Sequence, residues 1–190
     1  LISAGLVDRR PGAGTRVIAQ NVAMRYEHEI DTVDLLMQYG NSTRLQVISA
    51  QRLAASAEIA RQLEIAEGKD YLRLYTVRLE EPSRQPLAVT EMWVPVRTGV
   101  PADKLLDLST AARAVARFLE PSKLSKVEQV FDATSFSTED ARQLSIKKSE
   151  PAMRVQRRYR DAQGKMLMIA TSLHPPGRFA YAMVLSRNHR

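Results

Sequence analysis

The chain has 190 residues, of which 44% are hydrophobic, and this is enough for one main domain with its own core. It has no cysteine, which excludes disulfides and thiolate metal sites and is typical of the reducing cytoplasm, where we expect the protein to be; it also has no membrane-length apolar run and no signal sequence. The net charge of +7 is concentrated in residues 151–190, which favours a nucleic acid or an anionic ligand as a partner, or a solvated strand face.

Residues 5–17 predict a small basic β-hairpin. Two short runs flank a turn that holds Pro11, Gly12 and Gly14, residues that allow the tight geometry joining antiparallel strands. Such a hairpin suits a DNA phosphate backbone or a minor groove, although arginine-rich hairpins also occur on ordinary surfaces. The candidate DNA contacts are Arg9, Arg10, Gly12, Gly14, Thr15 and Arg16.

After a polar connection at 19–30, the chain repeats an order of strand, short helix and two strands. Residues 56–65 align with residues 137–146 at an offset of 81, with seven of ten positions identical. Each copy opens on a serine suited to cap a helix and has an acidic residue in the first turn. A period this long indicates an internal duplication rather than a solenoid.

The strands expected after the two helices are 71–81 and 86–95 in the first copy, and 151–161 and 165–174 in the second. Residues 101–108 and 109–119 predict two more helices between the copies. The predicted fold class is α+β: a mixed or antiparallel sheet, internally duplicated, with helices packed on it.

The hairpin resembles the wing of the winged helix-turn-helix domain in GntR-type transcription regulators. The order of wing, linker and duplicated domain resembles their HutC branch, whose UTRA effector domain is similar to the chorismate lyase fold. Residues 171–179 are similar to the closing His-Pro-x-x-Arg-Phe signature of that branch.

The resemblance implies a wing remnant at 1–18, a linker at 19–30 and a UTRA effector-binding and dimerisation domain at 31–190. Because the chain starts at Leu1 rather than Met, and the helices of the family precede the wing, we expect a piece of a longer regulator.

By this resemblance the protein is an allosteric transcription regulator, and most members of the branch are repressors. A small-molecule effector in the UTRA domain of a homodimer then controls binding of the full-length protein to operator DNA. The resemblance implies no metal and no cofactor.

The resemblance also implies effector-binding residues. In relatives that sense sugar phosphates, the anion sits at a helix start that matches Ser109, Thr110 and Ala111, and backbone N–H groups there suit an anion, although Ser109 also fits an ordinary N-cap. Arg78 matches the first arginine of an Arg-x-Arg pair. Glu80 replaces the second arginine, so Arg78 has Glu80 or another carboxylate as an alternative partner.

Other sugar-contacting residues of those relatives are replaced. Thr90 and Met168 stand in place of two glutamates, and His174 stands in place of a tyrosine. The remaining side chains favour a small organic acid, such as an amino-acid catabolite, over a phosphosugar. They are Arg78, Thr90, Met92, Arg157, Met166, Met168, Ser172 and His174.

Two of these residues have structural alternatives. Arg157 is in phase with the inner face of its strand, whereas Arg154, Arg158 and Arg160 should face out, but it equally suits a structural pair with Asp161. His174 is equally suited to be a packing histidine with satisfied hydrogen bonds. Tyr71 and Trp93 are expected in the core.

A chorismate lyase-like enzyme acting on a small carboxylate is the main rival function, and a scaffold without a ligand is another. The three histidines are not spaced for a metal site, and no nucleophile elbow, phosphate loop or dinucleotide fingerprint is present. The sequence therefore predicts a sensor rather than an enzyme.

Overall fold

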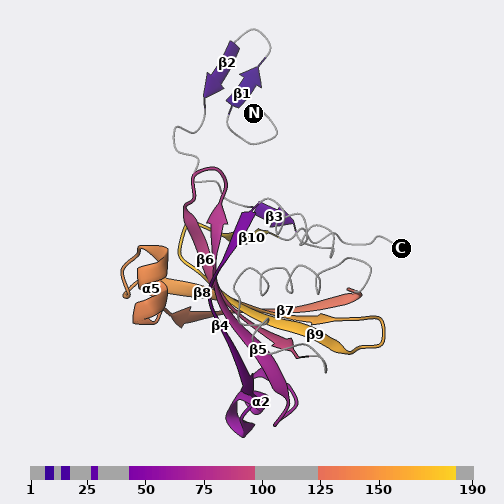
Figure 1. The fold of residues 1–190 in the computed structure, drawn as a ribbon. Coiled ribbons are helices and arrows are strands. Elements are labelled where there is room, and N and C mark those ends of the chain that lie inside the picture. The colour runs from indigo at the N-terminus through magenta and orange to yellow at the C-terminus, as the bar shows by residue number, and fades with distance from the viewer. Residues whose placement is uncertain (1–6, 11–13, 18–26, 30–42, 97–123, 183–190) are drawn as a thin grey trace, which may run out of the picture.

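The computed structural model describes residues 7–10, 14–17, 27–29, 43–96 and 124–182. Its centre is one six-stranded antiparallel sheet with the order β4-β5-β6-β9-β8-β7 (Figure 1). The strands are β4 (Thr43–Ala54), β5 (Asp70–Glu80), β6 (Pro86–Pro95), β7 (Lys126–Ser135), β8 (Pro151–Arg160) and β9 (Met166–His174). Sheet and helices together confirm the predicted α+β class.

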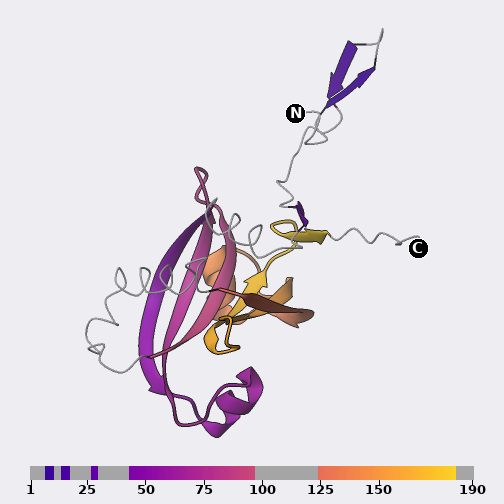
Figure 2. The ribbon, with the colours of Figure 1, turned by 90° about the vertical axis from the view of Figure 1, so that its right-hand side faces the viewer.

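The order of strands reflects the duplication. The first copy supplies β4, β5 and β6, the second supplies β7, β8 and β9 in mirrored order, and the copies join where β6 pairs with β9. Figure 2 shows that the sheet twists strongly between the two halves. The predicted arrangement of two related halves in one antiparallel sheet is confirmed.

Each copy contributes a short helix between its first two strands. These helices are α2 (Ala57–Leu63), capped by Ser56, and α5 (Thr138–Leu144), capped by Ser137. Both serines accept a hydrogen bond from a backbone N–H three residues later, as their positions in the repeat predict. α2 and α5 lie far apart in Figure 1, α2 at the bottom and α5 at the left.

The central sheet has two differently packed faces, because successive side chains of a strand point to opposite sides. The helix face carries Leu63 of α2 with Trp93 and Ile169 in one cluster, and Leu144 of α5 with Val89 in another. The opposite face, called the Thr90 face below, has a separate cluster on the same strands: Leu72, Leu74, Met92, Val94, Tyr159 and Met168.

Two smaller strand pairs complete the described residues. β1 (Val7–Arg10) and β2 (Gly14–Val17) form the predicted antiparallel hairpin. Within the predicted linker, β3 (Glu27–Glu29) pairs in parallel with β10 (Ala180–Ala182). Gly12 and the helices predicted at 101–108 and 109–119 lie outside the described residues. Neither described helix is long and apolar enough to cross a membrane.

Candidate functional site

The effector candidates that lie on strands share one face of the central sheet, except Met166, which packs with Trp93 and Ile169 on the helix face. Ser109, Thr110 and Ala111 fall outside the described residues. The other seven, which come from β5, β6, β8 and β9, all occupy positions of the Thr90 face: Arg78, Thr90, Met92, Arg157, Met168, Ser172 and His174. The structure therefore brings together residues that are up to 96 positions apart in the sequence.

A buried row of hydroxyl groups crosses the middle of this face. Thr76, Thr90 and Ser172 are register partners on β5, β6 and β9. The Thr90 and Ser172 hydroxyls are 2.9 Å apart, and the Thr76 hydroxyl donates to the Thr90 carbonyl at 3.0 Å. All three residues are buried. Methionines 92 and 168 are buried on the same face and give it apolar surface.

Two arginines flank the hydroxyl row from opposite sides. Arg78 is two residues beyond Thr76 on β5, whereas Arg157 lies beside Ala170, two residues from Ser172 in the other direction. Arg78 donates to the Thr43 hydroxyl at 2.5 Å, and Arg157 donates through Nε to the Gln129 side-chain oxygen at 2.7 Å. The row thus lies between two positive charges.

The structural pair proposed for Arg157 is wrong. Gln129 on β7, rather than Asp161, faces Arg157 because these two residues are register partners. The Asp161 carboxylate instead accepts from the backbone N–H groups of Gln163 and Lys165 and closes the turn between β8 and β9.

The side chain of His174 is buried and makes no hydrogen bond to another described residue. Its side chain stacks on Phe179, with ring centroids 4.2 Å apart. Within the described part of the chain, neither Nδ1 nor Nε2 has a hydrogen-bond partner, so no described residue satisfies the ring as the alternative of a packing histidine requires. Burial, and then the charges of Arg157 and Arg78, lower the pKa of His174 to about 3, so the ring is neutral at pH 7.

Arg178, which belongs to the closing His-Pro-x-x-Arg-Phe signature, fixes the loop that follows His174. Arg178 donates from Nη1 to two backbone carbonyls, that of Pro86 at 2.6 Å and that of Leu144 at 2.8 Å. It thereby links the start of β6 to the end of α5, while its neighbour Phe179 stacks on His174. No role was predicted for Arg178 from the sequence. Its place in the closing His-Pro-x-x-Arg-Phe motif was the one feature of the sequence that could have indicated a role.

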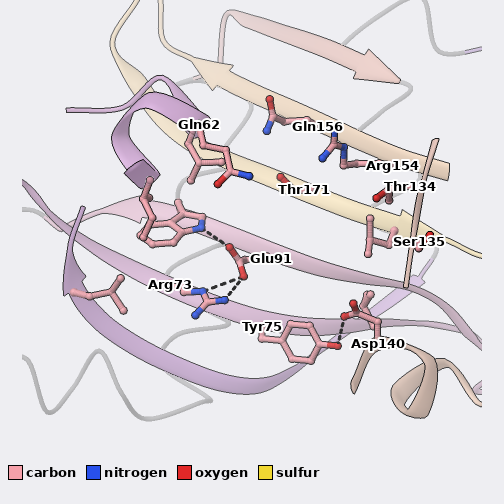
Figure 3. A pocket seen from close by; sticks show the side chains of 16 residues that line it. Gln62, Arg73, Tyr75, Glu91, Thr134, Ser135, Asp140, Arg154, Gln156 and Thr171 are labelled. Carbon is pink, nitrogen blue, oxygen red and sulfur yellow. Dashed lines mark hydrogen bonds and ion pairs between the residues drawn. The ribbon is translucent and has the colours of Figure 1, made fainter. Parts of the chain in front are cut away.

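The helix face has a cleft of about 450 Å³ that the sequence analysis did not predict (Figure 3). Both arginines of its lining are paired: Arg73 with Glu91 of the same lining, and Arg154 with Asp132, its neighbour on β7. Trp93 Nε1 donates to Glu91 at 2.7 Å, and the Tyr75 hydroxyl donates to Asp140 at 2.8 Å. These internal pairs neutralise the cleft.

Arg154 and Arg158 point away from Arg157, as their alternation predicts. The expectation that Arg158 is solvent-facing is wrong, because its side chain is buried and pairs with Glu64 at 3.1 Å. Glu64 caps the C-terminal end of α2 in a left-handed conformation, and this places its carboxylate over β8. Tyr71 and Trp93 are buried in edge-to-face contact, which confirms their core positions.

Among the described residues, no group of three or more histidine and carboxylate side chains is arranged to hold a metal ion.

Comparison with known proteins identifies the domain. The model of the UTRA domain family matches residues 38–180. The chain is 26% identical over 178 residues to the histidine utilization repressor of Pseudomonas putida, covering 93% of this chain and 69% of that protein.

Solved structures share the fold. The effector domain of PhnF from Mycobacterium smegmatis has a TM-score of 0.62 at 15% identity, covering 82% of this chain and 94% of that one. The C-terminal domain of the histidine utilization repressor from Pseudomonas syringae pv. tomato has a TM-score of 0.57 at 20% identity, covering 78% and 99%. These relatives are named as regulators or regulator domains, which favours a regulator over an enzyme. The chain belongs to the UTRA domain family and contains the effector domain of a GntR-type transcription regulator.

Proposed function

We propose that this chain senses a small anionic metabolite on the Thr90 face and thereby controls DNA binding by the full-length regulator. The observation that carries the proposal is the pair of arginines, 78 and 157, on either side of the buried hydroxyl row. Guanidinium groups that are partly or fully removed from water favour an anionic partner, and hydroxyl groups orient it.

The proposed effector is an organic acid rather than a phosphosugar. Glu80 lies on the same face as Arg78, two residues along β5, and its negative charge opposes a doubly charged phosphate ester. Met92 and Met168 add apolar surface that suits a carbon skeleton. The relative named for histidine utilization supports an amino-acid catabolite as the acid.

The remaining assignments belong to the same proposal. The β1–β2 hairpin is the wing that contacts DNA through Arg9, Arg10, Gly12, Gly14, Thr15 and Arg16. Ser109, Thr110 and Ala111 complete the effector site. The regulator acts as a repressor in the cytoplasm and is released from its operator when the effector binds.

The test is a thermal-shift screen of the chain against small carboxylates, amino-acid catabolites and sugar phosphates, followed by calorimetry. Ligand at about 100 times its Kd should stabilise the fold by about 2.7 kcal/mol. Arg78→Ala should abolish the shift, whereas Arg154→Gln, which changes an arginine of the helix face, should preserve it. A shift with sugar phosphates alone would contradict the organic acid, and conversion of the ligand would indicate an enzyme.

We also propose that the effector domain forms a homodimer. β4 and β7 are the outer strands of the central sheet, and within the described residues each has one paired edge. Unpaired strand edges offer backbone groups to a second chain. Sedimentation should show a dimer at micromolar concentration, and a monomer at all concentrations would contradict it.

A further inference from the structure

We propose that Arg157 and His174 together form the anion subsite of the Thr90 face, holding one carboxylate over the Ser172 hydroxyl. This inference rests on the proposed effector function of that face. It selects Arg157 and His174, rather than Arg78 alone, as the groups that bind the acid.

The first observation is that both residues have unused hydrogen-bonding atoms in a buried place. Arg157 is 5% exposed and His174 is 2% exposed. Within the described part of the chain, Arg157 Nη2 and both His174 ring nitrogens lack hydrogen-bond partners. Buried polar atoms are nearly always paired, and an unpaired one is costly. A ligand that supplies acceptor oxygens removes part of this cost, because it pairs Arg157 Nη2 and the N–H of the His174 ring.

The second observation is their placement around Ser172. His174 is two residues beyond Ser172 on β9, and Arg157 lies on β8 beside Ala170, two residues before Ser172. Their backbone positions are therefore separated by about 13 Å along the strand direction, a span that the arginine side chain shortens. Arg157 lowers the pKa of His174, so its charge acts on the ring across this span.

The free atoms match a carboxylate. Gln129 occupies Arg157 Nε, which leaves Nη2 to donate to one carboxylate oxygen. A neutral imidazole has one N–H, which donates to the other oxygen. The planar, acceptor-only carboxylate thus satisfies one atom of each residue.

The surroundings of His174 keep its ring neutral near pH 7. On the described strands of the Thr90 face and on β10, the titratable and charged side chains are Arg52 of β4, Asp70, Arg78 and Glu80 of β5, Arg157 and Tyr159 of β8, His174 itself and Tyr181 of β10. Both arginines disfavour the imidazolium. A bound carboxylate offsets part of their charge and raises the pKa of the ring from about 3, but the ring stays neutral near pH 7, so affinity should change little around neutrality.

Nuclear magnetic resonance of ¹⁵N-histidine-labelled protein, with acetate as the probe, tests the subsite. The chain has three histidines, and the signal lost in His174→Asn assigns the ring. We expect a neutral His174 without acetate and a saturable change of its ¹⁵N shifts with acetate at neutral pH, where acetate is ionised. Inorganic phosphate should compete weakly.

Variants separate this subsite from the broader function. Arg157→Gln should weaken acetate binding at least about tenfold, as should Arg157→Lys, which keeps the charge but lacks the guanidinium geometry. Arg154→Gln on the helix face is the control and should bind acetate normally. If a carboxylate stabilises the protein but leaves His174 unchanged and tolerates both Arg157 variants, the subsite is wrong while the sensor function stands. No His174 response to acetate at any concentration that preserves the fold would also overturn the subsite.

Discussion

His174 shows how neighbouring side chains determine the charge of a single residue. Burial is the largest cause of its lowered pKa, and Arg157 and Arg78 add to the effect. The unfolded chain has no such environment, so its histidine protonates near pH 6.5 while the folded ring remains neutral to about pH 3. Acid therefore favours the unfolded state through this one side chain.

We predict that the folded state loses stability between about pH 6.5 and 3 more steeply in the native chain than in His174→Asn. The unfolded state binds the extra proton in that range, so the free energy of unfolding falls as pH falls, by up to about 4 kcal/mol from this group. Denaturant unfolding at a series of pH values measures the difference. Parallel pH profiles for the two proteins would contradict a neutral buried ring.

Arg178 is a second residue whose contacts predict a measurable effect. Its guanidinium donates to the carbonyls of Pro86 and Leu144, which belong to different copies of the repeat. Arg178→Ala removes both bonds and should lower the free energy of unfolding by about 2 to 4 kcal/mol. Arg142→Ala is the control, because Arg142 pairs with Glu139 on the exposed surface of α5 and should have little effect. Equal losses would contradict the bridging role.

At the scale of elements, the duplication provides a natural pair of helices for comparison. Ser137 and Asp140 of α5 form a complete capping box, and Asp140 also accepts from Tyr75 of β5. In α2, Ile59 occupies the position of Asp140, so Ser56 caps the helix without a reciprocal bond. The two helices thus have similar sequences, but only α5 has the reciprocal hydrogen bonds of a capping box.

Ser137→Ala should therefore destabilise the protein more than Ser56→Ala, by about 1 to 2 kcal/mol against about 0.5 to 1 kcal/mol. Thermal and denaturant unfolding of the two variants provide the measurement. The opposite order would show that the cap of α2 has a larger role than its hydrogen bonds indicate.

The sequence predicted these elements well because their signals are local. Repeated serine caps locate both helices, and alternation places Arg78, Thr90 and Arg157 on one face. Alternation does not tell which residue lies across from another, so the pairing of Arg157 with Gln129 was missed. Burial of Arg158 was missed for the same reason, since Glu64 comes from a distant helix end.

For the whole molecule, the two copies share their hydrophobic cores. One cluster joins Val47 of β4 and Leu72 of β5 to Tyr159 of β8 and Met168 of β9. Neither half retains its apolar contacts without the other. The duplicated halves should accordingly unfold together.

The expected result is one cooperative transition in which fluorescence of Trp93, the single tryptophan, coincides with circular dichroism of the whole chain. Trp93 packs against Ile169 of the second copy, so it reports on the contact between the halves. Separate midpoints for the two signals would indicate that the copies unfold independently.

The strict alternation along β6 limits how its length can evolve. Thr90 and Met92 face the proposed effector, while Glu91 and Trp93 face the cleft between the helices. Deleting one codon in the middle of this strand would exchange the two sets for the rest of its length, placing a carboxylate and an indole where the effector binds. Insertions and deletions tolerated within β6 should therefore come in pairs of residues, whereas the turns at its ends can change by one.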